Sequence, residues 1–238
     1  MGQGVTCPSE NPGILLQVNS SLFNVIMIRI VDFKLYLVTD KKLFTNEGLF
    51  VNAVEEALKA GVRAVQLREK DLGTRDLLEL AYKMRDLTAG YGARLFINDR
   101  SDIAMCVKAD GVHLGQTSMP VFAVRKVVGD SMMIGVSTHT LNEAETAERE
   151  GADFITFGPV YQTPSKLKYG EPVGLDALLN ASEQISIPVF GIGGIKPYNM
   201  KDVIGAGARG VAVISGILGE ADVKSATDMY MKEMDRLS

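Results

Sequence analysis

The sequence predicts a single α/β domain in which eight parallel strands close into a (β/α)8 TIM barrel, preceded by a short irregular N-terminal extension. Short apolar, β-branched runs alternate with longer segments of helical periodicity, and there are eight such runs. The same short glycine-containing sequence precedes four of the runs. A doubly wound open sheet typically has about five or six strands, so eight repeats favour the closed barrel.

The extension comes first along the chain. Residues 1–32 show no sustained period, so we expect them to lie outside the barrel, which would occupy residues 33–238. The glycines and prolines of this extension are Gly2, Gly4, Pro8, Pro12 and Gly13.

The strand runs follow in order. Their nearly continuous apolar character predicts parallel strands that are buried on both faces. The runs are Leu35–Val38, Ala64–Leu67, Leu95–Ile97, Gly111–Leu114, Met133–Val136, Phe154–Phe157, Ile187–Phe190 and Val211–Ile214.

Helical segments lie between the strand runs. The apolar spacing predicts helices over Leu77–Leu87 and over Leu141–Arg149, where Thr140 has the character of an N-cap. A glycine at the C-terminus of a helix, followed by a strand, is typical of a βα repeat. It occurs in Gly61-Val62-Arg63, Gly92-Ala93-Arg94, Gly151-Ala152-Asp153 and Gly207-Ala208-Arg209, and Lys108-Ala109-Asp110 is a variant without glycine.

The composition excludes several classes of function. The 238 residues carry 25 Lys and Arg against 29 Asp and Glu, a net charge of −4 that argues against binding nucleic acid. The two cysteines, Cys7 and Cys106, are too far apart in the sequence for a CxxC motif, so we expect a reducing, cytoplasmic location. No segment has the features of a secretory signal or of a membrane span, so no membrane partner is expected.

Polar residues follow each strand run, where barrels of this class place their active sites. Strand alternation points Gln66 and Arg68 into the mouth and brings Lys70 to the rim, which suits a polyphosphate. An ion pair between Arg68 and Glu69 is the structural alternative. Asn98 could cap a helix, and the neighbouring Asp99 could hold Mg²⁺.

Glycines follow the last two strand runs, in Gly191–Gly194 and Ile214–Gly216. Barrels often bind phosphate with these two loops, and a role only in forming turns is the alternative. The long loop 158–170 is rich in hydroxyls and lysines, which indicates either a lid over an anionic substrate or a solvated loop.

The two histidines have different sequence contexts. His113 lies within an apolar run and is expected to be packed, whereas His139 follows a strand end and is the better candidate for proton transfer. Ser137 beside His139 could form a hydrolase pair, but the sequence around it contains no nucleophile elbow.

Taken together, these segments resemble the thiamine phosphate synthase and thiazole tautomerase superfamily over about residues 34–236, and the synthases in particular. The matching strings are LYLVTD from Leu35, QLREK from Gln66, Asn98-Asp99, DGVHLGQ from Asp110, GVSTHT from Gly135, GPVYQTPSK from Gly158, GIGGI from Gly191 and Val213–Gly216. The resemblance implies a Mg²⁺-assisted transferase that joins a hydroxymethylpyrimidine diphosphate to a thiazole phosphate and releases pyrophosphate. Its partners would be these small molecules, and a homo-oligomer is compatible with the fold.

The resemblance also implies roles for individual residues. The pyrimidine diphosphate would be held by Gln66, Leu67, Arg68, Glu69, Lys70, Asn98, Ser137 and Lys166, with Asp99 as the metal ligand. The thiazole phosphate would be held by Thr163, Pro164, Ser165, Gly194, Ile214 and Ser215. The residues expected to act in catalysis are Arg68, Lys70, Ser137, Lys166 and His139.

One position departs from the synthase pattern. The family places a second magnesium-binding aspartate two residues after the Gly115-Gln116 pair, and this chain has Ser118 there. A hydroxyl is a weaker ligand than a carboxylate, which leaves open a thiazole tautomerase with His139 as proton shuttle. A paralogue that binds thiamine precursors without turnover is a third alternative.

Overall fold

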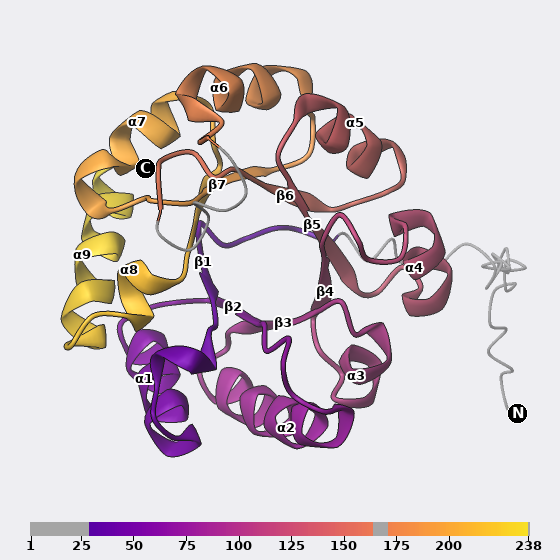
Figure 1. Cartoon of the computed structure of the whole chain (residues 1–238), viewed down its shortest axis with the longest axis vertical. Coiled ribbons are helices and arrows are strands. Elements are labelled where there is room, and N and C mark those ends of the chain that lie inside the picture. Colours follow the sequence, from indigo (N-terminus) through magenta and orange to yellow (C-terminus); the bar gives the residue numbers. More distant parts are fainter. Residues whose placement is uncertain (1–28, 164–170, 238) are drawn as a thin grey trace, which may run out of the picture.

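The computed structural model describes residues 29–163 and 171–237, and in that part of the chain eight parallel strands close a barrel (Figure 1). Each strand pairs with the next one in the sequence, and β8 pairs with β1 to complete the ring. The predicted fold class is therefore confirmed. The strands are β1 (Leu35–Val38), β2 (Ala64–Leu67), β3 (Arg94–Asn98), β4 (Gly111–Leu114), β5 (Met133–Thr138), β6 (Phe154–Phe157), β7 (Val189–Ile192) and β8 (Gly210–Val213).

Helices surround the barrel as an outer ring in Figure 1. They are α1 (Glu47–Lys59), α2 (Thr74–Gly90), α3 (Ser101–Cys106), α4 (Val121–Val128), α5 (Leu141–Arg149), α6 (Gly174–Gln184), α7 (Met200–Gly205), α8 (Ser215–Leu218) and α9 (Val223–Arg236), with short 3-10 helices η1 (Lys41–Leu43) and η3 (Pro197–Asn199). Helix α5 has the predicted bounds, and the Thr140 side chain accepts from the Glu143 N–H as its N-cap. Among the helices described, none combines the length and apolar character needed to cross a lipid bilayer.

Four strands differ from the sequence prediction by one or two residues at their ends, namely β3, β5, β7 and β8. Strand β7 begins at Val189 rather than Ile187, because Pro188 has no N–H to donate and contributes only its carbonyl, which accepts from Ile155 N at 3.0 Å. Strand β5 continues past Val136 to Thr138, since its last residues pair with β6. This extension keeps Ser137 in regular strand geometry at the barrel mouth.

Strand alternation divides the apolar residues into two cores. One set faces the helices and forms the larger cluster, which includes Leu37 and Ile97. The other set fills the barrel interior with the aromatic rings of Tyr36, Phe96, Phe154 and Phe190, along with smaller apolar side chains. The barrel is therefore a packed core rather than a pore, as expected for eight strands.

The residues just before β1 close the amino-terminal end of this interior. Phe33 is 3% exposed, and its ring lies 5.2 Å from that of Phe190 and 5.5–5.7 Å from three other aromatic rings. Val31 is also buried, and Asp32 pairs with Arg94 at 2.7 Å, which lowers the pKa of the aspartate. Of the predicted extension, residues 29–32 thus lie against the barrel, and residues 1–28 lie outside the described residues.

The recurrent glycine turn has the predicted geometry. The glycine of each repeat has a positive φ, 109° at Gly61, 61° at Gly92, 96° at Gly151 and 84° at Gly207. Lys108 takes the corresponding place before β4 and also has a positive φ, of 51°. A residue with a Cβ is strained in this left-handed region.

We expect Lys108→Gly to raise the free energy of unfolding by about 0.5–1 kcal/mol. Relief of the left-handed strain, roughly 1–2 kcal/mol, exceeds the extra chain entropy that glycine adds to the unfolded state. Gly92→Ala is the reciprocal control, because its Cβ would have no atom within 4 Å and only backbone strain would change. Urea denaturation measures both variants, and a loss of stability in Lys108→Gly would contradict the strain argument.

Candidate functional site

The candidate site is the carboxyl-terminal mouth of the barrel, where inward-facing polar side chains lie above the aromatic core. Gln66, His113 and Thr156 are all at most 2% exposed and face the interior from β2, β4 and β6. They form the floor of the mouth, and the loops after the strands form its rim.

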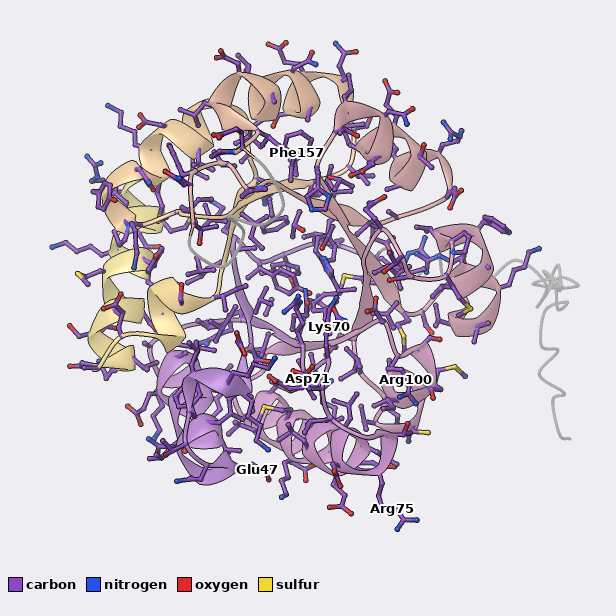
Figure 2. The ribbon with its side chains drawn as sticks, in the orientation of Figure 1. Glu47, Lys70, Asp71, Arg75, Arg100 and Phe157 are labelled. Atoms are coloured by element: carbon purple, nitrogen blue, oxygen red, sulfur yellow. The ribbon has the colours of Figure 1, made fainter. Side chains whose placement is uncertain are left out.

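The loop after β2 brings two cations to the mouth. Arg68 is half-buried and Lys70 is exposed, and Figure 2 shows Lys70 near the centre of the ring of strands, whereas Arg75 points away from the barrel. Neither Arg68 nor Lys70 makes an ion pair within residues 29–163 and 171–237. Within the described residues, Arg68 and Glu69 do not form the ion pair that the sequence left as the structural alternative.

Glu69 instead forms hydrogen bonds with the loop after β1. Its carboxylate accepts from the Thr39 hydroxyl at 2.6 Å and from the Lys41 N–H at 3.0–3.1 Å, while Thr39 Oγ1 accepts from Arg68 N at 3.0 Å. Burial raises the pKa of Glu69, and the bond from Thr39 opposes that shift. Glu69 is therefore placed to orient the Arg68 backbone. The Leu67 side chain packs in the outer apolar cluster, so only its backbone is available to the mouth.

The end of β3 holds an acidic group beside the cations. Asp99 has a φ of 59°, and its carboxylate accepts from the Asn98 amide at 2.7 Å and from the Ser118 hydroxyl. Ser118 in turn accepts from Gly115 N at 2.7 Å. Asn98 is not a helix cap, since Arg100 occupies the N-cap position of α3. The strained backbone at Asp99 is typical of functional sites.

His113 is buried, as expected, and it contacts groups on both sides. Its Nδ1 lies 3.3 Å from the Tyr36 hydroxyl and its Nε2 lies 3.0 Å from Ser137 Oγ. Burial lowers the pKa of His113 to about 3, and the nearby Arg68 adds to this effect, whereas Asp99 opposes it. The imidazole is therefore neutral throughout the physiological range.

We expect the protein to lose about 1.6 kcal/mol of stability between pH 6.5 and pH 5 because of His113. The unfolded chain protonates this histidine near its ordinary pKa of 6.5, whereas the folded state excludes the proton until about pH 3. The unfolded state binds more protons in this window, so stability falls as the pH falls.

Denaturant titrations of the parent and of His113→Gln at several pH values measure this contribution as a difference in slope. Glu69, whose raised pKa acts in the opposite direction, is common to both proteins and cancels. Equal slopes would mean that His113 is protonated in the folded state.

His139 has a contact that accounts for its position. Its backbone N–H donates to Glu143 Oε2 at 2.7 Å, and its ring Nδ1 lies 3.2 Å from the same oxygen. Its side chain is 39% exposed at the start of α5. This geometry gives His139 a part in beginning the helix, and its role in proton transfer stays a prediction.

The loops after β6 and β7 lie directly against each other. Val160 N donates to Ile192 O at 2.8 Å, and Tyr161 N donates to Gly193 O at 3.0 Å. Gly194 has a φ of 65°, and a Cβ there would come within 2.7 Å of Tyr161 Cβ. Glycine is required for this close approach, which brings Thr163 and Gly194 to the same side of the mouth.

Strand β8 leads directly into the first turn of α8. Ile214 is its N-cap, and Ser215 begins the helix, so the first N–H groups have no intrahelical acceptor. Such groups are suited to a phosphate. The remaining predicted residues, Pro164, Ser165 and Lys166, lie outside the described residues.

Tyr36 and Thr156 line the same region and were not predicted from the sequence, whereas Thr39 was expected at the mouth because it directly follows the first strand run. The signal available was strand alternation, since Tyr36 and Thr156 occupy inward positions of β1 and β6. The contact of Thr39 with Glu69 has no such signal, because the two residues are 30 positions apart.

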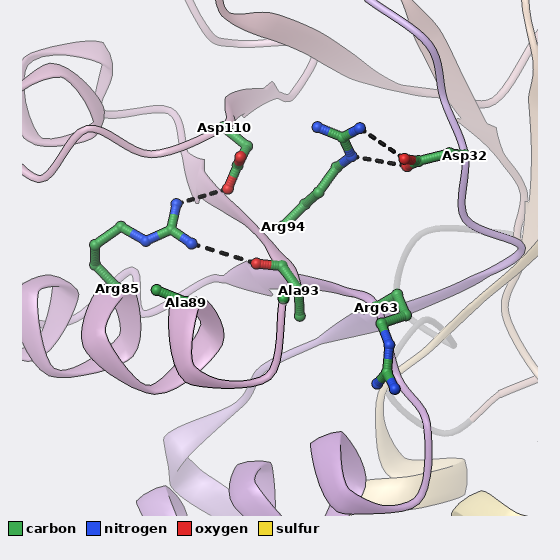
Figure 3. A pocket seen from close by; sticks show the side chains of 8 residues that line it. Asp32, Arg63, Arg85, Ala89, Ala93, Arg94 and Asp110 are labelled. Carbon is green, nitrogen blue, oxygen red and sulfur yellow. Dashed lines mark hydrogen bonds and ion pairs between the residues drawn. The ribbon is translucent and has the colours of Figure 1, made fainter.

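A separate cavity of about 450 Å³ lies at the opposite, amino-terminal end of the barrel (Figure 3). Two of its three arginines are paired, Arg94 with Asp32 at 2.7 Å and Arg85 with Asp110 at 2.6 Å. Arg63 donates to the carbonyls of Leu58 and Val62. These charges are used to hold the base of the fold, and the chemistry of such barrels occurs at the other end.

Comparison with known proteins finds similar chains over most of this sequence. Residues 35–217 match the family model described as thiamine monophosphate synthase. A thiamine-phosphate synthase of Clostridium acetobutylicum is 46% identical over 82% of this chain and 91% of its own. A Geobacter sulfurreducens protein, provisionally named for the same enzyme, is 55% identical over 81% of this chain and 90% of its own.

A solved structure gives the same result. The thiamine phosphate pyrophosphorylase of Pyrococcus furiosus is 38% identical, with a TM-score of 0.78 over 86% of this chain and 96% of that chain. Its similarity therefore extends over nearly the whole barrel.

Proposed function

The chain belongs to the thiamine monophosphate synthase family, and we propose that its barrel mouth joins 4-amino-2-methyl-5-hydroxymethylpyrimidine diphosphate to 4-methyl-5-(2-hydroxyethyl)thiazole phosphate. The products are thiamine phosphate and pyrophosphate. The observation that carries the proposal is the pair of cations, Arg68 and Lys70, which have no ion-pair partner in the described part of the chain. A tautomerase has no use for such a clamp.

The reaction needs a clamp for the leaving group. Departure of pyrophosphate leaves a pyrimidine-methyl cation, so the enzyme must stabilise the charge that develops on the leaving oxygens. Arg68 and Lys70 supply that stabilisation, and the Ser137 hydroxyl adds a hydrogen-bond donor. Holding the thiazole nitrogen in line with the breaking bond supplies the rest.

The second substrate fits the opposite side of the mouth. Its phosphate would accept from the N–H groups at the start of α8 and from the backbone at Gly194. Thr163, Pro164 and Ser165 would also hold this phosphate, as the resemblance to the family implies. Separate sites for the two anions keep their charges apart and place the reacting atoms between them.

The residues present fit Mg²⁺. Asp99 supplies one carboxylate and Ser118 an adjacent hydroxyl, and Mg²⁺ is usually held by one or two carboxylates together with substrate phosphates and water. Bound there, the ion would neutralise diphosphate oxygens. No group of three histidine, cysteine or acidic side chains suited to a metal occurs within the described residues, so substrate oxygens would complete the coordination.

A cytoplasmic location and a homo-oligomeric state are proposed along with this function. Both rest on the sequence arguments from cysteine usage and from the fold.

The test is product formation by the purified full chain with both precursors, with and without Mg²⁺. Thiamine phosphate is detected by fluorescence after oxidation, and the expected result is metal-dependent product. A folded preparation that forms no thiamine phosphate in the presence of Mg²⁺ would refute the proposal. Isomerisation of the thiazole carboxylate phosphate would then be the next assay.

We expect Ser118→Asp to lower the Mg²⁺ concentration for half-maximal rate by about tenfold. A second carboxylate beside Asp99 adds charge to the metal site, which raises its affinity. Ser118→Asn is the matched control, because it has nearly the same size as the aspartate variant without the charge. The same metal dependence in both variants would remove Ser118 from the metal site.

A further inference from the structure

A chain of hydrogen bonds crosses the barrel interior below the mouth. Gln66 Nε2 lies 3.2 Å from the Tyr36 hydroxyl, which lies 3.3 Å from His113 Nδ1. His113 Nε2 lies 3.0 Å from Ser137 Oγ, and Thr156 Oγ1 lies 3.4 Å from the same atom. These hydrogen bonds thus connect five strands and meet at the Ser137 hydroxyl, which faces the mouth.

The first three members are inaccessible to solvent. Tyr36 is 0% exposed, His113 is 1% and Gln66 is 2%, so water does not satisfy their polar atoms. Burial raises the pKa of Tyr36 and lowers that of His113 to about 3. The phenol therefore keeps its proton and the imidazole carries only one.

The direction of the chain follows from what each group can do. The Gln66 amide nitrogen only donates, so the Tyr36 oxygen accepts and the phenol proton is left for His113 Nδ1. A neutral imidazole that accepts at Nδ1 carries its proton on Nε2. Nε2–H then donates to Ser137 Oγ.

The Ser137 hydroxyl can still donate one hydrogen bond. Its oxygen accepts from His113 and from Thr156, which occupies both lone pairs. With Thr156 as the donor to Ser137, the proton of Ser137 has no other acceptor among the described residues, and the side chain lies at the end of β5. The only direction left for donation is the barrel mouth.

We propose that Tyr36 and His113 are positioning residues that hold Ser137 as an obligatory hydrogen-bond donor to an anionic oxygen of the bound diphosphate. The identity of the anion rests on the proposed function, and the direction of the chain does not. If the imidazole proton were on Nδ1, the Ser137 proton would be drawn inward to Nε2 and no donor would face the substrate. A donor oriented before binding needs no reorganisation during the reaction.

The tautomer can be measured without any turnover. The chain has only two histidines, so ¹⁵N-histidine labelling gives two sets of ring signals, and His139→Gln assigns the remaining set to His113. The expected result is an Nε2–H tautomer in the parent and a shift toward Nδ1–H in Tyr36→Phe, which keeps the ring packed but removes the hydroxyl. An Nδ1–H ring in the parent would overturn the proposal.

The kinetic test is a double-mutant cycle. We expect Ser137→Ala to lower kcat about 100-fold and Tyr36→Phe about tenfold, each with little effect on KM for the thiazole phosphate. In the Ser137→Ala background, Tyr36→Phe should change kcat less than twofold, because the tyrosine acts through the serine. Additive losses would overturn the proposal.

Thr138→Val is the matched control for a purely structural effect. Thr138 is a buried hydroxyl next to Ser137 that donates to Thr156 O at 3.1 Å, and its loss should combine additively with Ser137→Ala. If no product forms with any protein, the proposed function fails, and the tautomer measurement still decides the direction of the chain.

Discussion

Replacing Arg68 with glutamine is expected to lower kcat for thiamine phosphate formation by about 10²- to 10³-fold. Arg68 is half-buried at the mouth, and its charge has no ion-pair partner within the described residues. Negative charge on the departing pyrophosphate grows in the transition state, so a cation that faces it stabilises the transition state more than the ground state. Binding of the thiazole phosphate, on the other side of the mouth, should stay nearly unchanged.

The control for this prediction lies at the other end of β2. Arg63 precedes β2 at the opposite end of the barrel and donates to the carbonyls of Leu58 and Val62, so Arg63→Gln should leave kcat near the parent value. Arg68→Lys should recover part of the rate, because it restores the charge without the planar fork of the guanidinium.

Steady-state kinetics and calorimetric binding of thiazole phosphate separate the two effects at Arg68. An equal loss of rate in Arg63→Gln and Arg68→Gln would point to a change in stability rather than in the clamp. A parent-like rate in Arg68→Gln would remove this arginine from the reaction.

Much of the fold follows from local patterns in the sequence. Strand runs and the turns at Gly61 and Gly92 are short-range features, and alternation within a strand decides which side chains face inward. That is why Gln66 was correctly expected to point into the barrel. The start of the next strand also follows from the glycine turns, because in four repeats only one or two residues separate the turn glycine from that strand.

The details of the site depend on closure of the barrel. The contact between Tyr36 and His113 joins residues 77 positions apart, and no local pattern encodes a contact at that separation. Glu69 is similar, since its sequence position beside Arg68 favoured an ion pair, and the packed structure directs it to Thr39 instead. Ser118, which stands where the family pattern has an aspartate, contacts Asp99 and so lies beside the proposed metal ligand.

The N-terminal boundary shows a different limit of sequence reasoning. Val31 and Phe33 alternate in the manner of a strand, but the polar neighbours and the short length of the segment concealed a role in the core. Their burial depends on the open end of the barrel, which exists only after all eight strands have assembled.

We expect Phe33→Ala to lower the free energy of unfolding by about 3–5 kcal/mol. The ring contacts four other aromatic rings, those of Tyr36, Phe96, Phe154 and Phe190, and it is 3% exposed. Its removal leaves a cavity at the base of a closed barrel. The strands cannot move inward to fill this cavity without breaking the hydrogen bonds between them. For a domain stable by about 5–15 kcal/mol this is a large share of the total.

Two variants test whether the loss comes from the cavity. Phe33→Leu keeps most of the volume and should cost less than half as much, while Phe122→Ala, at a side chain 50% exposed on α4, should change stability by about 0.5 kcal/mol or less. Urea denaturation of the three proteins gives the comparison. Similar values for Phe33→Ala and Phe122→Ala would mean that residues before β1 only rest on the barrel. A large loss confined to Phe33 would make this residue part of the domain core, because its ring packs against Tyr36 and three other aromatic rings at the base of the barrel interior.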